Sequence, residues 1–211
     1  MNKNNTDQNS SSNEEQTSRA QVPKNELNPL EEKIVQHLAT TGPRNINETS
    51  KEISANYEPV YAAFYSLEKK EMIMPVDKVS YRGRDYDAFW LAEKGLLVVL
   101  LDGGDPDIIL EVVKETFPKL DDISLFAQIV CRLPERALRV ILSLYPSVSL
   151  QVGIQEVLKF LFMSSNLSID ELKTLYDIVK GSPRHKQMAD ETIKKAGDRF
   201  EELRKMIGTK S

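Results

Sequence analysis

The sequence has few of the residues on which disulfides and metal sites depend. Cys131 is its one cysteine, and His37 and His185 are its two histidines, so an intramolecular disulfide is excluded and no metal site is expected. We expect both histidines to be surface or packing residues and Cys131 to be a small buried hydrophobe in an apolar helical stretch. No motif for phosphate binding or nucleophilic catalysis is present, so we expect neither an enzyme nor a cofactor.

Long apolar runs and a positive net charge are also missing. The longest aliphatic run, Leu96 to Leu101, has six residues, whereas a membrane-spanning helix needs about 20. The first residues lead into Ser and Gln rather than an apolar segment, so we expect no secretory signal, no membrane partner and a cytoplasmic location. With 28 Lys and Arg against 32 Asp and Glu, the formal net charge is −4. A protein that coats nucleic acid through charge alone is therefore excluded, and any contact with nucleic acid must be local.

Apolar residues become frequent only after the first part of the chain. Residues 1–28 are rich in Asn, Ser and Gln, and we interpret them as a disordered tail because they cannot bury enough apolar surface to offset the entropy of ordering. Apolar spacing then predicts a helix from Pro29 to about Thr41, a short helix near 46–54 and a third helix with Pro59 in its first turn. A β-hairpin centred on Gly83 and a helix at 92–101 follow.

Everything after Gly103-Gly104, which supplies a plausible domain boundary, is predicted to be helical. The expected helices lie near 106–117, 121–132, 134–144, 149–164, 169–180 and 183–207, joined by short connections that suit an antiparallel bundle or a stack of helical hairpins. The predicted fold class is therefore mainly α, with an all-α C-terminal domain at residues 103–211.

Two segments carry a resemblance to a known family. Residues 59–73 contain the third helix and the start of the first strand, and residues 89–95 contain the return strand and the start of the next helix. Over about residues 29–102, the chain resembles the winged helix-turn-helix superfamily of prokaryotic and archaeal transcription regulators. The resemblance implies three helices plus a β-hairpin wing, with the third helix in the major groove of double-stranded DNA and the basic wing on its backbone. It implies a DNA-binding transcriptional regulator.

The third helix has an apolar face and an outer face. Helical spacing directs Val60, Ala63, Phe64 and Leu67 inward. The candidate DNA-binding residues are Tyr57, Tyr61, Ala62, Tyr65, Ser66 and Lys69 on the helix, and Lys78, Arg82 and Arg84 in the wing. The three wing cations favour phosphate contacts, although hairpin tips are also charged for solubility. The aromatic outer face also suits a protein partner, so the alternative function is a winged-helix adaptor in a larger complex.

The last helix carries an apolar seam with heptad-like spacing. Its members are separated by 4, 3, 4, 3 and 4 residues, and they are Ala189, Ile193, Ala196, Phe200, Leu203 and Ile207. Such a seam can form a dimer contact, whereas most amphipathic helices of this length pack on their own domain. The sequence therefore predicts either a homodimer through this helix or an intramolecular packing face.

Overall fold

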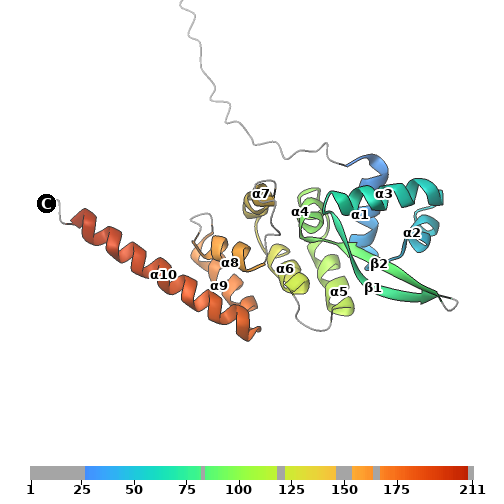
Figure 1. Ribbon diagram of the computed structural model, residues 1–211. Helices are drawn as coiled ribbons and strands as arrows, with labels where there is room; N and C mark the ends of the chain where they lie inside the picture. The colour runs from blue at the N-terminus through green and yellow to red at the C-terminus, as the bar shows by residue number, and fades with distance from the viewer. Residues whose placement is uncertain (1–26, 82–83, 118–121, 146–153, 164–166, 209–211) are drawn as a thin grey trace, which may run out of the picture.

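The computed structural model describes residues 27–81, 84–117, 122–145, 154–163 and 167–208, which are mainly helical with one two-stranded antiparallel sheet (Figure 1). The elements in chain order are α1 (Pro29–Thr41), α2 (Ile46–Glu52), α3 (Tyr57–Lys69), β1 (Ile73–Tyr81), β2 (Arg84–Leu91), α4 (Glu93–Leu101), α5 (Pro106–Thr116), α6 (Asp122–Val130), α7 (Glu135–Leu144), α8 (Ile154–Met163), α9 (Ile169–Val179) and α10 (Pro183–Gly208). The mainly helical fold class is therefore confirmed. Residues 146–153, where the helix predicted at 149–164 would begin, lie outside the described residues.

Capping boxes define the start of three helices. Asn45 and Ser168 each accept a hydrogen bond from the backbone N–H of the glutamate three residues later, and the carboxylate of that glutamate accepts one from the backbone N–H of the cap residue. Asn28 and Glu31 form a third box at the start of α1. Residues 1–26 of the predicted tail lie outside the described residues, whereas Asn28, which was assigned to that tail, is the N-cap of α1.

The β-hairpin is longer than its apolar residues predict. β1 and β2 pair from Ile73 opposite Leu91 to Tyr81 opposite Arg84. The hairpin projects from the helices around it (Figure 1). The polar part of the predicted connection is therefore mostly strand.

A third segment pairs with the base of the hairpin. Arg44, between α1 and α2, forms an isolated bridge with Phe89. The Arg44 backbone N–H donates to the Phe89 carbonyl at 3.1 Å, and the Phe89 backbone N–H donates to the Arg44 carbonyl at 2.9 Å. The hairpin is thus tied to the connection between the first two helices.

The apolar core continues across the predicted boundary at Gly103-Gly104. Trp90 on β2 is fully buried, donates its indole N–H to the Leu38 carbonyl at 3.0 Å, and has its ring 5.1 Å from that of Phe117, which follows α5. α5 packs against α1, and α4 packs against α6 and α7. The elements on the two sides of the boundary therefore share one hydrophobic cluster.

Two contacts fix α4 against its neighbours. Gly95 lies so close to the connection between α3 and β1 that a Cβ at this position would be 2.0 Å from the Met72 carbonyl oxygen. At the start of α4, the Glu93 carboxyl group is 2.7 Å from the Tyr145 hydroxyl at the end of α7. Burial raises the pKa of Glu93, although the hydrogen bond from Tyr145 opposes this shift.

Among the described elements α10 is the longest helix, with 26 residues, or about 39 Å at 1.5 Å per residue. Its N-terminal part packs against α8 and α9, and its C-terminal part extends past both (Figure 1). Over the described residues, none of the helices combines the length and apolarity that a membrane span requires.

Candidate functional site

The apolar face of α3 faces the core as predicted. Val60 and Leu67 are fully buried, and Ala63 and Phe64 are at most 5% exposed. The Phe64 ring also meets the Phe89 ring of β2 edge-on at a centroid distance of 5.4 Å. α3 is therefore held firmly against both α1 and the hairpin, which fixes the direction of its outer face.

The outer face of α3 carries a row of three exposed tyrosines. Tyr57, Tyr61 and Tyr65 are 51%, 56% and 69% exposed. They follow one another at intervals of four residues, and the Tyr57 and Tyr61 ring centroids are 6.2 Å apart. Ala62 and Lys69 are also exposed. Five of the six positions predicted on α3 are therefore open to a partner.

Ser66, the sixth predicted position, has a different environment. It is half-buried, and its hydroxyl hydrogen-bonds the carboxylate of Glu31 on α1. Glu31 is 1% exposed and also accepts from Lys70 Nζ at 2.8 and 2.9 Å and from the Asn28 backbone N–H at 2.8 Å. Burial alone would raise the pKa of Glu31, but the hydrogen bonds from Lys70, Ser66 and Asn28 together lower it below its ordinary value.

The contacts of Glu31 form an anchor for α3 that sequence analysis missed. We call Glu31, Ser66 and Lys70 the Glu31 anchor. It joins the first turn of α1 to the C-terminal end of α3, and Ser66, which is half-buried, contributes its hydroxyl to it. The one available signal was the spacing of Asn28 and Glu31, which matches a capping box but gives no indication of the contact with α3.

A hollow of about 360 Å³ lies between the tyrosine row, the start of α2 and β2. Besides the three tyrosines of α3, it is lined by Asn45, Ile46, Asn47, Phe64, Glu68, Tyr86, Asp87 and Phe89. Tyr86, on the hairpin side, is 39% exposed and was not predicted as a site residue. The lining thus combines aromatic rings and hydroxyls with amides and two carboxylates, which can pack on flat apolar groups and exchange hydrogen bonds with polar ones.

Of the three predicted wing cations, Lys78 lies within β1 and Arg84 begins β2. In the backbone pairing, Lys78 is opposite Asp87, and Arg84, the first residue of β2, is opposite Tyr81. Arg82 and Gly83 lie outside the described residues, as do the side chains of Lys78 and Arg84. The role assigned to these three cations therefore remains a prediction.

The residues set aside as structural have packing environments. His37 Nε2 is 2.7 Å from the Glu52 carboxylate, and His185 is 4% exposed with its Nδ1 2.7 Å from the Ser182 hydroxyl. Burial raises the pKa of the half-buried Cys131 thiol to about 12. Among the described residues, the His, Cys, Asp and Glu side chains form no group of three that could hold a metal ion.

Comparison of the chain with protein-family models, with curated proteins and with solved structures gives no significant match. The site is therefore interpreted from its own geometry.

Proposed function

We propose that residues 29–102 form a winged helix-turn-helix that binds double-stranded DNA and that the protein is a transcriptional regulator. In this proposal α3 enters the major groove and the hairpin is the wing. The observation that carries it is the exposed outer face of α3, whose opposite face is fixed by the core and by the Glu31 anchor.

The order of the elements supports this proposal. Two helices joined by the Arg44 segment precede α3, and a projecting hairpin follows it. Because the Arg44 segment pairs with Phe89 at the base of the hairpin, and the Phe89 ring contacts Phe64 of α3, the hairpin and α3 belong to one packed unit. Such a unit can present a helix and a hairpin to the same duplex.

The dimensions of the tyrosine row suit a major groove. Tyr57 and Tyr65 are eight residues apart, which is about 12 Å along the helix axis and corresponds to three or four base pairs. The rings can pack against thymine methyl groups, and the hydroxyls can hydrogen-bond phosphates or base edges. The wing cations Lys78, Arg82 and Arg84 would add phosphate contacts that carry no sequence preference.

One observation favours a second function, a protein-binding adaptor. Glu68 and Asp87 line the hollow between the tyrosine row and the hairpin, so carboxylates separate the two parts of a duplex-binding surface. Carboxylates repel phosphates, whereas tyrosines beside carboxylates suit a protein segment with basic side chains. In this alternative the outer face of α3 binds a protein in a larger complex.

Selection of bound sequences from a pool of random duplexes tests the proposal. The full chain should enrich a defined sequence, and Tyr61→Ala should weaken binding to it by roughly 1 to 3 kcal/mol, or about 5- to 150-fold. Ile108→Ala is a matched control because it removes an exposed apolar side chain of α5 (40% exposed) far along the chain from α3. Enrichment that is unchanged in Tyr61→Ala would remove α3 from the mechanism.

The same experiment separates the two functions. If no duplex is bound even at about 50 mM salt, where phosphate contacts are stronger than at physiological salt, DNA binding is ruled out and the adaptor function is favoured. Because Tyr61 is more than half exposed, its replacement should leave the melting temperature nearly unchanged.

A further inference from the structure

We propose that a second copy of this chain binds antiparallel along α10, with the C-terminal end of one α10 in the groove between α9 and α10 of the other copy. The proposal concerns the C-terminal helices and does not depend on DNA binding by α3. It rests on three features: an open apolar groove, a helix that extends past its own neighbours, and a residue pattern that is complementary to itself when reversed.

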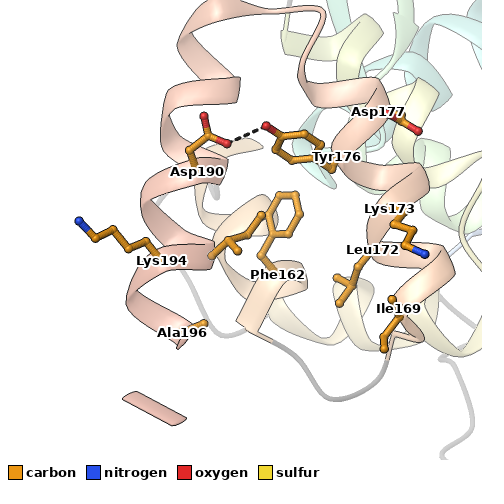
Figure 2. A pocket seen from close by; sticks show the side chains of 10 residues that line it. Phe162, Ile169, Leu172, Lys173, Tyr176, Asp177, Asp190, Lys194 and Ala196 are labelled. Carbon is orange, nitrogen blue, oxygen red and sulfur yellow. Dashed lines mark hydrogen bonds between the residues drawn. The ribbon is translucent and has the colours of Figure 1, made fainter. Parts of the chain in front are cut away.

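The groove, which we call the α9–α10 groove, has a volume of about 670 Å³. Phe162 from the end of α8 lies between the two helices, with Leu172 and Ile169 of α9 on one side (Figure 2). Within the described residues, Ile169 and Ile193 on its walls are 73% and 44% exposed. Large apolar side chains so exposed on both walls of a groove are typical of a surface that binds an apolar partner.

The seam on α10 continues beyond this groove. Ala189 is buried against its own domain, Ile193 and Ala196 line the groove, and α10 continues as a helix to Gly208. By sequence, Phe200, Leu203 and Ile207 extend the same spacing along that helix. The part of α10 that extends past α8 and α9 therefore carries three large apolar residues at seam positions (Figure 1).

The seam is complementary to itself in the antiparallel direction. Its members lie in pairs at equal distances on either side of Asp198: Ala196 and Phe200, Ile193 and Leu203, Ala189 and Ile207. Two antiparallel copies that cross near Asp198 would place Ala196 opposite the partner's Phe200 and Ile193 opposite the partner's Leu203. Because Ala189 is buried in its own domain, the partner's Ile207 would lie over the neighbouring end of the α9–α10 groove, beside Asp190.

The charges beside the seam favour the same direction. Asp190, on the rim of the groove, follows Ala189, and Arg204 follows Leu203 on the same side of the seam. The antiparallel arrangement brings Asp190 near the partner's Arg204 twice, and it brings Arg199 near the partner's Arg199 once. A parallel arrangement would instead bring Arg199 near the partner's Arg204 twice and align Ala196 with itself. Opposite charges thus outnumber like charges only in the antiparallel arrangement.

Sedimentation velocity of the full chain tests the association itself. At about 50 µM the wild type should be a dimer, and Ile193→Glu, which buries a charge in the proposed contact, should weaken dimerisation at least tenfold. Ile108→Glu, on an exposed apolar residue of α5, is the matched control and should stay dimeric. A monomeric wild type would overturn the proposal, whether or not the variants fold, and so would a dimer that Ile193→Glu leaves intact.

A charge exchange tests the direction. Arg204→Glu should weaken dimerisation about fivefold because it places two like-charged pairs beside the seam. Combining it with Asp190→Arg should restore the wild-type affinity, since each pair is then opposite in charge again. If the double variant is as weak as, or weaker than, Arg204→Glu alone, the antiparallel arrangement is wrong.

Discussion

Replacing Lys70 with Met tests whether the Glu31 anchor holds α3 in place. The Glu31 side chain is 1% exposed, and the Lys70 side chain is 33% exposed. Lys70→Met removes the ammonium group and keeps most of the stem, so a buried carboxylate loses its closest opposite charge. Breaking a fully buried ion pair costs about 3 to 5 kcal/mol. Because Lys70 is one-third exposed and Glu31 keeps its bonds from Asn28 and Ser66, we expect about 2 kcal/mol.

Trp90 provides the assay, because it is the single tryptophan and is fully buried. Its fluorescence during urea unfolding should report a free energy of unfolding about 2 kcal/mol lower for Lys70→Met, which corresponds to a melting temperature lower by about 4 to 8 °C for a chain of this size. Glu32→Gln changes an exposed neighbour in the same helical turn and serves as the control. It should change stability by less than about 0.5 kcal/mol.

The pH dependence gives a second test of the anchor. The folded-state pKa of Glu31 is lowered, so its contribution is fully present above the ordinary carboxyl pKa of about 4.3 and is lost as pH falls through the folded-state value. Glu31→Gln has no carboxyl group there, so its stability deficit relative to the wild type should narrow as pH falls below about 4.3. A Lys70→Met variant as stable as the wild type, or a constant deficit of Glu31→Gln from pH 7 to 3, would refute the reasoning.

Three further predictions follow from buried groups and from a close approach. Because the pKa of the Cys131 thiol is raised to about 12, alkylation at pH 8 should be slow in the folded protein and fast in urea; rapid alkylation of the folded protein would contradict this. The raised pKa of Glu93 means that its charged form costs stability above the ordinary carboxyl pKa, and that this cost disappears as pH falls. Glu93→Gln still accepts a hydrogen bond from the Tyr145 hydroxyl and should remove this pH dependence of the free energy of unfolding. If the variant keeps the wild-type dependence between pH 4 and 7, Glu93 is not its source. Gly95→Ala places a Cβ 2.0 Å from the Met72 carbonyl oxygen and should cost about 3 kcal/mol or more, whereas Gly197→Ala meets nothing within 4 Å and should gain about 0.5 to 1 kcal/mol in thermal or urea unfolding. Equal effects of the two substitutions would contradict the close approach.

The faces of the helices were predictable from the sequence because they depend on local spacing. Val60 and Leu67 lie on the inner side of α3, and Tyr61 and Tyr65 lie on the outer side, as the 3.6-residue period requires. The capping boxes at Asn45 and Ser168 depend on equally local spacing, since both partners lie within one turn. These features need no knowledge of the neighbouring elements.

The features that sequence analysis missed depend on contacts between distant segments. Ser66 has the right spacing for the outer face, but its side chain is half-buried and its hydroxyl hydrogen-bonds the Glu31 carboxylate of α1. Likewise, Gly103-Gly104 marks a turn, yet the contact of Trp90 with Phe117 shows that the core continues across it. Tyr86 was missed because its place in the lining of the hollow depends on the strand pairing that positions β2.

The central claim, that the N-terminal unit binds duplex DNA with α3 and the hairpin, is tested most directly by titrating the full chain with a random-sequence duplex at several salt concentrations. Fluorescence anisotropy should show that the logarithm of the affinity falls linearly with the logarithm of the salt concentration. The double variant Arg82→Ala, Arg84→Ala should lower the slope by about one unit for each lost phosphate contact. Binding that is absent at low salt, or a slope that the double variant leaves unchanged, would contradict the claim.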